Sequence, residues 1–453
     1  MENVKGKKVT VLGAARSGVA AAELLKLHGA IVFVSDTGTD ADLMPYVGKL
    51  RSLSIPYETG RHSDKVFDAE LIVLSPGIPT KAPVIVEAEK RNIPVVSELE
   101  FASWFCHAPM VAVTGTNGKT TTTALLGRLF HDAKRKHIVG GNIGDAFSGL
   151  VSKLDKDSVA VLEVSSFQLD FCRTFHPHVS VLLNLTPDHL DRYDGSFEKY
   201  MASKSRIFER QTEQDFLIYN YDDQETCEMV RRLASLHVRV LAFGIDQRYD
   251  EGAFVEDDKL VTVIGGERHE IVETELISIR GRHNLYNAMA ATLAAQIMSV
   301  PIPSIRATLK NFKGVEHRLE FVRELNDVKY INDSKATNVD SVWYALEAYQ
   351  EPIVLLLGGR DKGNDYSKLI DPVEQHVKAI VAIGESAGTV VSEFSTVTKV
   401  VKSSSMDEAV NMARGLAAKG DIVMLSPACA SFDWFRNYEH RGKVFKQLVN
   451  ALQ

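Results

Sequence analysis

A short segment between residues 111 and 120 has the composition of a phosphate-binding loop. An apolar run, residues 111–113, is followed by two glycines in residues 114–118, and Lys119 and Thr120 then open a helical pattern. Glycines let backbone N–H groups approach a polyphosphate, and a helix N-terminus favours negative charge. In such loops a lysine reaches the outer phosphates and a hydroxyl binds Mg²⁺. The segment predicts a nucleoside triphosphate site, although its glycine spacing is shorter than the usual pattern and a plain helix start is the alternative.

Residues 114–120 resemble the ATP loop of the Mur ligase and folylpolyglutamate synthetase superfamily. Enzymes of this superfamily activate a carboxylate with ATP and couple it to an amine. The resemblance implies that the loop binds ATP through Gly115, Thr116, Asn117, Gly118, Lys119, Thr120 and Thr121.

Two further segments resemble the same family and bring candidate metal ligands. Glu163 ends an apolar run and opens the family's Glu-Val-Ser-Ser-Phe-Gln pattern, and carboxyl ends of strands are where open sheets meet ligands. His189 lies in an Asn-x-x-x-Asp-His-Leu-Asp segment, where Asp188 can orient its imidazole. The resemblance implies that Glu163 binds magnesium and that His189 binds metal or substrate. Without it, a solvated acid and a structural histidine are the simpler interpretations.

Lys204 is a special case, because its proposed role depends on the resemblance alone. The family carries at this place, within residues 200–208, a lysine that carbon dioxide converts into an anionic metal ligand. From its chemistry alone, Lys204 is expected to be an exposed lysine on a helix, since lysines are rarely buried. The magnesium ligands that the resemblance implies are Thr120, Glu163, His189 and Lys204.

The last third of the chain carries two more ligase-like segments, residues 314–320 and 332–338. The resemblance implies that Arg318 neutralises phosphate charge in the transition state, that Asp333 contacts the nucleotide and that Lys335 positions a phosphate or carboxylate. Asn284 and Asn287 resemble the family's nucleotide-contacting helix start and are favoured over His283. The implied catalytic residues are Lys119, His189, Lys204 and Arg318.

Local patterns in this region indicate which amino acid is added. Residues 332–338 resemble the branch of the family that adds D-glutamate, and residues 358–363 and 426–433 agree with it. The branch that adds a diamino acid usually has an Asp-Asn-Pro-Arg segment, which this chain lacks. A dicarboxylate calls for a cation and well-placed donors. The implied D-glutamate contacts are Thr337, Lys362, Ser431, Phe432 and Tyr438.

Near the start of the chain, a glycine-containing loop at residues 13–18, followed by Asp36, resembles a dinucleotide-binding site. The pattern is imperfect, because Ala15 stands where the middle glycine belongs. In the family, this region holds the UDP part of the substrate. The resemblance therefore assigns the UDP-linked substrate to Arg16, Ser17, Asp36, Thr37, Ser75, Gly77, Asn142 and His189.

Three successive series of strand and helix patterns must position these residues. Short apolar runs alternate with helical periodicity, which predicts an α/β fold with parallel sheets. We expect a Rossmann-like UDP-substrate domain at residues 1–107, a central P-loop-type ATPase domain with a small β-rich part at 108–314, and a Rossmann-like amino-acid-binding domain at 315–453. The turn-rich residues 301–303 and the segment 312–317 mark the second boundary. Expected strands are residues 9–12, 31–34, 71–74, 110–113, 159–164, 179–183, 329–331, 353–357, 379–383 and 422–425.

Bulk properties exclude several classes of partner. The 453 residues carry a formal charge of -7, which argues against nucleic acid because backbone binding relies on clustered Lys and Arg. No leading apolar segment suggests export, and no apolar stretch is long enough to span a membrane. The four cysteines are scattered and are expected to be reduced thiols. We expect a monomer in the cytoplasm that binds small molecules.

Taken with these features, the resemblance implies a ligase that uses ATP and Mg²⁺ to add D-glutamate to a UDP-linked muramoyl-alanine through an acyl phosphate, in peptidoglycan precursor synthesis. A sibling ligase for another amino acid is the alternative within the family. A nicotinamide-dependent oxidoreductase built on residues 13–18 and a non-catalytic nucleotide-binding module are alternatives outside it.

Overall fold

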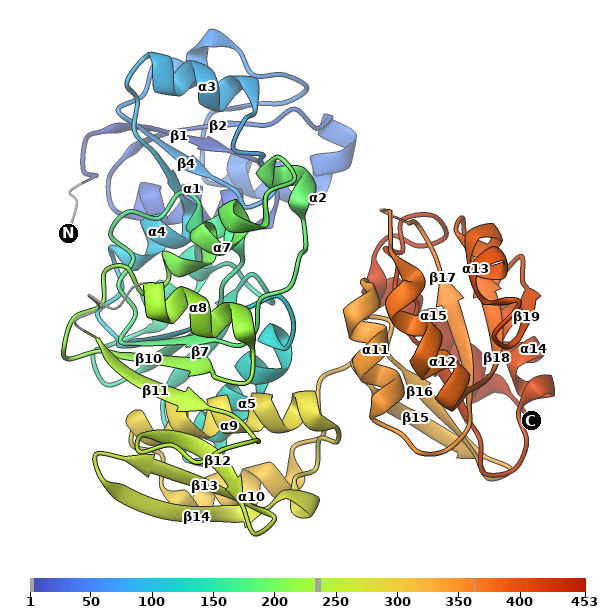
Figure 1. Cartoon of the computed structure of the whole chain (residues 1–453). Coiled ribbons are helices and arrows are strands. Elements are labelled where there is room, and N and C mark those ends of the chain that lie inside the picture. Colours follow the sequence, from blue (N-terminus) through green and yellow to red (C-terminus); the bar gives the residue numbers. More distant parts are fainter. Residues whose placement is uncertain (1–3, 233–237, 362) are drawn as a thin grey trace. The chain divides into compact units, whose positions relative to one another are not determined.

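Three α/β domains, each built on its own sheet, make up the chain (Figure 1). The computed structural model describes residues 4–232, 238–361 and 363–453. The predicted three-domain α/β fold is confirmed. The first two sheets belong to one compact unit, Met1–Ile277 with Tyr286–Asn311, and the third belongs to a second unit, Ser278–Leu285 with Phe312–Gln453.

The first domain is a five-stranded parallel sheet with the strand order β3-β2-β1-β4-β5. Its strand β4 is buried at every position, as expected of a parallel strand covered on both faces. The order reverses between β1 and β4, and open sheets bind ligands beyond the carboxyl ends of the strands at such a point. The strands are β1 (Lys8–Leu12), β2 (Ile31–Ser35), β3 (Tyr57–Glu58), β4 (Leu71–Leu74) and β5 (Val95–Ser97). The helices are α1 (Arg16–Leu27), α2 (Asp40–Ser52), η1 (Asp64–Phe67), α3 (Pro83–Lys90) and α4 (Glu98–Ser103).

The central domain has a nine-stranded sheet, in the order β14-β13-β12-β11-β10-β9-β6-β8-β7. Strands β12 to β14 pair antiparallel and form the predicted β-rich part, and they extend the parallel part of the same sheet. The strands are β6 (Met110–Thr114), β7 (His137–Gly141), β8 (Val159–Glu163), β9 (Val179–Leu182), β10 (Phe216–Asn220), β11 (Arg239–Phe243), β12 (Gly252–Glu256), β13 (Lys259–Ile264) and β14 (Glu267–Glu273).

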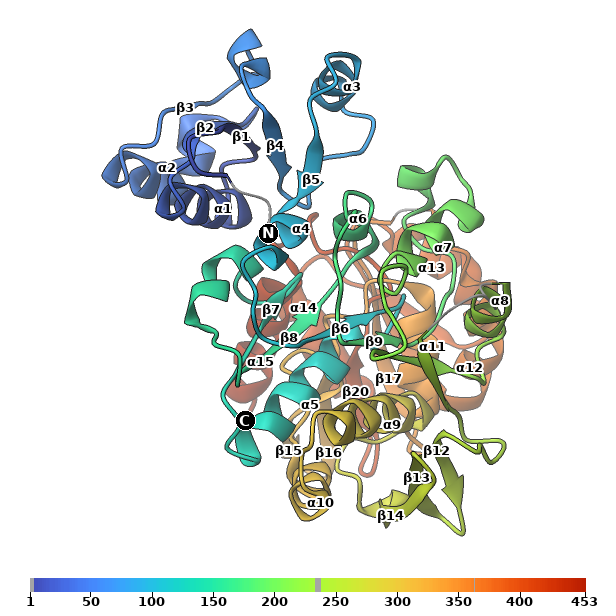
Figure 2. The same cartoon turned by 90° about the vertical axis from the view of Figure 1, so that its left-hand side faces the viewer.

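Helices α5 and α9 of this domain lie side by side (Figure 2), joined by a hydrogen bond from Thr122 Oγ1 to Asn287 Oδ1 at 3.2 Å. This contact places the start of the long helix α9 against the first turn of the helix that follows the phosphate loop. The helices are α5 (Lys119–Asp132), η2 (Phe147–Gly149), η3 (Val151–Lys153), α6 (Ser166–Leu169), η4 (Leu190–Tyr193), α7 (Phe197–Ser205), α8 (Gln224–Arg232), η5 (Thr274–Leu276), α9 (Arg282–Ile297) and α10 (Ile302–Asn311).

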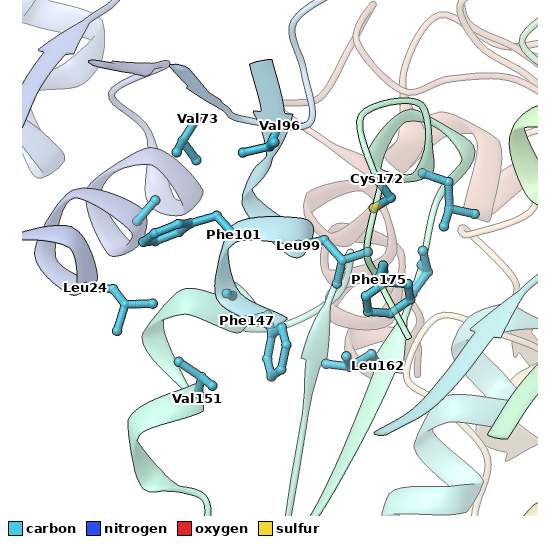
Figure 3. Close-up of a cluster of buried hydrophobic side chains, with 14 of the residues drawn as sticks. Leu24, Val73, Val96, Leu99, Phe101, Phe147, Val151, Leu162, Cys172 and Phe175 are labelled. Carbon is cyan, nitrogen blue, oxygen red and sulfur yellow. The ribbon is translucent and has the colours of Figure 1, made fainter. Parts of the chain in front are cut away.

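One hydrophobic cluster runs from the first sheet into the second (Figure 3). Leu99 and Phe101 of α4 belong to it together with Phe147 and Leu162 of the central domain, and all four are fully buried. Burying apolar surface stabilises a fold by about 25 cal/mol per Å². The first two domains are therefore packed through a common core.

The third domain has a six-stranded sheet in the order β15-β16-β20-β17-β18-β19, with β15 antiparallel to β16 and the other pairs parallel. Apolar clusters cover both of its faces. The strands are β15 (Glu320–Leu325), β16 (Val328–Asn332), β17 (Ile353–Gly358), β18 (Val377–Ile383), β19 (Lys399–Lys402) and β20 (Ile422–Leu425). The helices are α11 (Val339–Glu347), η6 (Tyr366–Leu369), α12 (Ile370–His376), α13 (Ala387–Phe394), α14 (Met406–Leu416) and α15 (Tyr438–Ala451).

One local prediction is wrong. Residues 301–303 were expected to be a turn, but α10 begins at Ile302. Proline is tolerated in the first turn of a helix, where its missing N–H has no intrahelical partner, so Pro303 fits the helix start. All four cysteines are free, as predicted. Among the described residues, no helix is long and apolar enough to cross a membrane.

Candidate active site

The predicted phosphate loop lies between β6 and α5. Gly115 and Gly118 both have positive φ, 148° and 84°, and Gly118 caps the helix in the left-handed conformation. A Cβ on Gly115 would lie 3.0 Å from the Leu183 side chain, so the backbone runs close to the end of β9. Left-handed backbone favours glycine, which explains both glycines in physical terms. The first helical residue is Lys119, so the loop presents a helix N-terminus.

Asn184, just after β9, holds this loop in place. Its backbone O accepts a hydrogen bond from Thr116 N at 2.9 Å, and its side chain exchanges two with the backbone of Asn117, at 2.8 and 3.0 Å. Thr116 Oγ1 also donates to Thr186 O at 3.0 Å. No role was predicted for Asn184 itself, although an asparagine directly after a buried strand was a signal for one. The loop is therefore shaped before any nucleotide binds.

We expect Gly118→Ala to lower the free energy of unfolding of the central domain by about 1–3 kcal/mol, because a left-handed alanine is strained. Its Cβ would also clash with Asn287 Oδ1. The matched control is Gly144→Ala, since Gly144 has a φ of 60° and no described atom lies within 4 Å of its Cβ position. Thermal unfolding of both variants measures the difference, and equal losses would contradict a role for the clash.

Two lysine amines meet at one carbonyl oxygen of the loop. Lys119 Nζ lies 2.9 Å and Lys204 Nζ 2.8 Å from Gly115 O. Lys204 is only 1% exposed, so the interpretation as an exposed helix lysine is wrong. Burial and the nearby Lys119 charge hold the pKa of Lys204 well below its usual value. The missed signal was the spacing of Tyr200, Ser203 and Lys204, which places them on one buried face of α7.

Thr120 and Glu163, two of the predicted metal ligands, are in direct contact. Thr120 Oγ1 donates to Glu163 Oε2 at 2.7 Å, and Asn142 Nδ2 donates to Glu163 Oε1 at 2.8 Å. Glu163 ends β8 and is buried. The three side chains come from separate segments at the carboxyl edge of the sheet. Oxygen ligands of this kind are those that Mg²⁺ prefers.

His189 lies on the loop after β9. Thr186 of this loop is hydrogen-bonded to Thr116 of the phosphate loop. His189 has a positive φ of 52°, and its ring packs edge-on against Phe167 with centroids 5.0 Å apart. Its Nε2 is 3.6 Å from Asp188 Oδ2, which is too far for a hydrogen bond, so the orienting role of Asp188 stays a prediction. The side chain is 40% exposed and so is accessible to a ligand.

Six of the eight residues predicted for the UDP-linked substrate lie at the carboxyl edge of the first sheet, whereas Asn142 and His189 belong to the central domain. Arg16 and Ser17 open α1, Thr37 follows β2, and Ser75 and Gly77 follow β4. Asp36 accepts hydrogen bonds from Ala14 N at 2.6 Å and Gly38 N at 2.7 Å, so it braces two loops. Within the described chain, Ser75 Oγ is buried without a hydrogen-bond partner, as a hydroxyl that awaits a ligand would be.

In the third domain, the buried Asp333 pairs with the partly exposed Arg318 next to β16. Arg318 Nη1 lies 3.8 Å from Asp333 Oδ1, and Ser426 Oγ donates to Asp333 Oδ2 at 2.8 Å. Burial raises the pKa of Asp333 to about 6, against the lowering effects of Arg318 and Ser426. The carboxylate is thus held in a site that disfavours its charge.

The raised pKa gives a prediction for stability against pH. Because the folded-state pKa of Asp333, about 6, exceeds the unfolded value of about 4, the unfolded state binds fewer protons between these pH values. The contribution of Asp333 to stability is therefore lost as pH rises from about 4 to 6. We expect the free energy of unfolding of Asp333→Asn minus that of the parent to increase by about 2 kcal/mol over this range. Denaturant titrations are followed by tryptophan fluorescence in a Trp104→Phe background, so that only the tryptophans of the third domain remain. A difference in the free energy of unfolding that stays constant or falls would contradict the raised pKa.

Arg441 joins the two loops that carry Thr337 and Ser431, two of the predicted D-glutamate contacts, and was not predicted from the sequence. It is 1% exposed, and its guanidinium donates to Ser334 O at 2.8 Å and Cys429 O at 3.1 Å, joining two loops. Lys335 Nζ lies 3.4 Å from the Tyr438 hydroxyl. Thr337 precedes α11, while Ser431 is buried and Phe432 exposed after β20. Lys362 lies outside the described residues.

The remaining predicted residues lie at the start of α9. Asn284 Nδ2 donates to Arg280 O at 2.7 Å, and Asn287 receives the Thr122 hydrogen bond described above. A separate acidic group was not predicted: Glu316, His317 and Glu320 have possible ligand atoms within 4.8 Å of one another. Lys446 Nζ offsets part of its negative charge, 3.0 Å from Glu316 and 2.5 Å from Glu320.

Solved structures with the same fold are distant in sequence. The UDP-N-acetylmuramate-alanine ligase of Thermotoga maritima has a TM-score of 0.62 at 18% identity, covering 98% of this chain and 99% of that one. A pseudomurein peptide ligase type C from Methanothermus fervidus has a TM-score of 0.61 at 20% identity, covering 99% and 100%. The MurF ligase of Thermotoga maritima in complex with ADP has a TM-score of 0.58 at 17% identity, covering 99% and 96%. These likenesses confirm the fold.

Comparison with known families covers most of the chain. Residues 7–97 match the Mur ligase MurD-like N-terminal domain, residues 113–295 the Mur ligase middle domain, and residues 317–429 the Mur ligase glutamate ligase domain. Curated relatives named UDP-N-acetylmuramoylalanine–D-glutamate ligase include those of Chloroherpeton thalassium, 47% identical, and Salinibacter ruber, 45% identical. Each comparison covers 100% of this chain and 99% of the relative.

The family and branch predicted from the motifs are confirmed by these full-length relatives. The chain belongs to the Mur ligase family and, within it, to the UDP-N-acetylmuramoylalanine–D-glutamate ligases.

Proposed function

We propose that this chain uses ATP to join D-glutamate to UDP-N-acetylmuramoyl-L-alanine, a step of peptidoglycan precursor synthesis. The observation that carries the proposal is the loop at Gly115, where the amines of Lys119 and Lys204 meet next to the Thr120–Glu163 pair. A phosphate loop, a buried amine and an acidic oxygen ligand are the groups that carboxylate activation by ATP needs.

The chemistry explains why ATP is required. An ionised carboxylate is a poor electrophile and oxide is a poor leaving group. The carboxylate of the muramoyl-alanine substrate attacks the γ-phosphorus of ATP and ADP leaves, which gives an acyl phosphate. The amine of D-glutamate then attacks the acyl carbon and phosphate leaves. In this proposal Lys119 and Arg318 stabilise negative charge on the transferring phosphoryl group.

Thr120, Glu163, His189 and Lys204 would hold magnesium. The contact between the Thr120 hydroxyl and the buried Glu163 carboxylate supports this, because hard oxygen ligands are those that Mg²⁺ takes. Magnesium would supply a positive charge that offsets the charge of the phosphates. The ADP bound in the MurF structure supports nucleotide use within this fold.

The environment of Lys204 favours its modification by carbon dioxide. Only a neutral amine attacks the carbon of CO₂, forming an N–C bond and releasing a proton, and burial holds the pKa of Lys204 well below its usual value, which favours the neutral amine. The product is an anion, which is better placed beside the Lys119 cation than a second ammonium would be. A buried lysine next to another cation is otherwise unfavourable, so this role explains its position.

We assign the substrates to the three domains as the sequence predicts. The UDP part is assigned to the first domain, residues 1–107, ATP to the central domain, 108–314, and D-glutamate to the third, 315–453. The unpartnered Ser75 hydroxyl, in the part of the chain that the structure describes, supports the first assignment, and the Lys335–Tyr438 contact braced by Arg441 supports the third. We further propose that the enzyme acts as a cytoplasmic monomer.

One assay tests the proposal. The protein is given ATP, Mg²⁺ and UDP-N-acetylmuramoyl-L-alanine, and release of ADP is measured with D-glutamate, L-glutamate, glycine or a diamino acid. Release with D-glutamate alone is the expected result. Release with another amino acid would assign the chain to a sibling activity, and nucleotide binding without any release would favour a non-catalytic module. Nicotinamide absorbance changes would support the oxidoreductase alternative.

A further inference from the structure

A pocket of about 570 Å³ opens at the carboxyl edge of the first sheet. Its walls are mostly apolar, with Phe67, Ile78 and Pro79 among them, and Thr37 and His62 contribute polar atoms. The Arg91 guanidinium lies 4.2 Å from the centroid of the Phe67 ring and helps to fix this wall. Pockets of this size with few polar groups suit a small ring system, and the polar groups decide which one binds.

The hydrogen bonds of His62 fix its tautomer. Its Nδ1 lies 2.7 Å from Ser35 Oγ, and Ser35 Oγ lies 2.8 Å from Glu58 Oε1. Burial opposes the charge of Glu58, but hydrogen bonds from Ser63 outweigh it and hold the pKa of Glu58 below the usual value, so this carboxylate only accepts. The single hydroxyl proton of Ser35 therefore goes to Glu58. Ser35 Oγ must then accept from His62, so Nδ1 carries a proton.

The other ring nitrogen of His62 is consequently an acceptor. Burial lowers the pKa of His62, so the ring is neutral at neutral pH and Nε2 keeps its lone pair. Nδ1 points to Ser35 at the buried end of β2, and Nε2 lies on the opposite side of the ring. Ser35 and Glu58 are paired neighbours in β2 and β3, so the sheet itself holds the network in position.

We propose that His62 Nε2 accepts a hydrogen bond from the N3–H of uracil and thereby selects uridine over cytidine in the UDP-linked substrate. This inference rests on the proposed function, which assigns UDP to the first domain. Thr37 and Gly77, two of the predicted UDP contacts, line the same pocket as His62. Uracil presents a donor at N3, whereas cytosine presents an acceptor there, which would face the His62 lone pair. A site built to pair with a donor rejects a ligand that lacks it.

Calorimetric binding tests the proposal without turnover. The ligands are UDP-N-acetylmuramoyl-L-alanine and its cytidine and 3-methyluridine counterparts, and the proteins are the parent, His62→Leu and Ser35→Ala. The parent should bind the uridine compound at least about tenfold more tightly than the other two. His62→Leu should lose about tenfold in affinity for the uridine compound and none for the other two. This variant should therefore bind the uridine and 3-methyluridine compounds equally well. Ser35→Ala keeps His62 but removes the hydroxyl that fixes the proton on Nδ1. This variant should therefore show a smaller preference for the uridine compound.

The other outcomes overturn the inference in ways that can be told apart. Equal losses for all three ligands in His62→Leu, or unchanged selectivity, would overturn the role of His62 while leaving UDP in the first domain. If the parent bound none of the three ligands, the proposed substrate itself would be wrong. Circular dichroism and thermal unfolding of each variant show whether it is folded.

Discussion

Lys119→Ala is expected to lower the rate of D-glutamate-dependent ADP release by about 10³-fold, mainly through kcat. Its amine is held by Gly115 O and Thr116 O, 2.9 and 2.7 Å away, at the first residue of α5. A phosphoryl transfer spreads charge over the phosphate oxygens, and removing one preorganised donor costs about 10²–10³ in rate. Initial rates at several ATP concentrations separate kcat from KM.

The matched control is Lys136→Ala in the same domain. Lys136 is exposed and pairs with Asp155 at 2.6 Å on the surface, and such pairs contribute little. Its variant should ligate at the parent rate. A parent-like rate of ligation by Lys119→Ala would contradict the assignment of residues 114–120 as the phosphate loop.

Lys204→Ala is expected to lower the same rate by at least about 100-fold, since a metal ligand that stabilises the transition state would be lost. The buried side chain leaves a cavity, so short carboxylic acids such as acetate should restore part of the activity by supplying the missing anion. Rates are measured with and without the added acid, and in buffers freed of carbon dioxide for the parent.

Lys199→Ala is the control on the same helix. Lys199 is 58% exposed and pairs with Asp194 at 2.7 Å. It should behave as the parent does in every condition. Full activity of Lys204→Ala, or equal effects of both variants, would exclude a metal role for Lys204.

Much of the fold could be predicted, because buried parallel strands are short apolar runs. Strand β17, which is buried at all six positions, is an example. Strands β7 and β15 are among those that were missed, since their residues look polar or glycine-rich: His137–Gly141 ends in two glycines, and Glu320–Leu325 is a partly exposed edge strand. Edge strands carry weaker patterns because only one side is paired and they are less buried.

The site was predictable where its parts are adjacent in sequence and not where they are distant. The loop at Gly115–Lys119 needs only a strand, glycines and a helix start. The burial of Lys204, the clamp of Asn184 and the two loops joined by Arg441 depend on segments far apart in the chain. Sequence periodicity does not specify such contacts, so these residues became visible only in the folded protein.

The common core of the first two domains limits how this gene can recombine. Exchanging the first hundred residues for those of a distant relative would place unfamiliar side chains against Phe147 and Leu162, where Leu99 and Phe101 now pack. Mismatched volumes in a buried core destabilise by about 1–5 kcal/mol each. We therefore expect the two domains to be inherited together, with compensating substitutions on both sides of their interface.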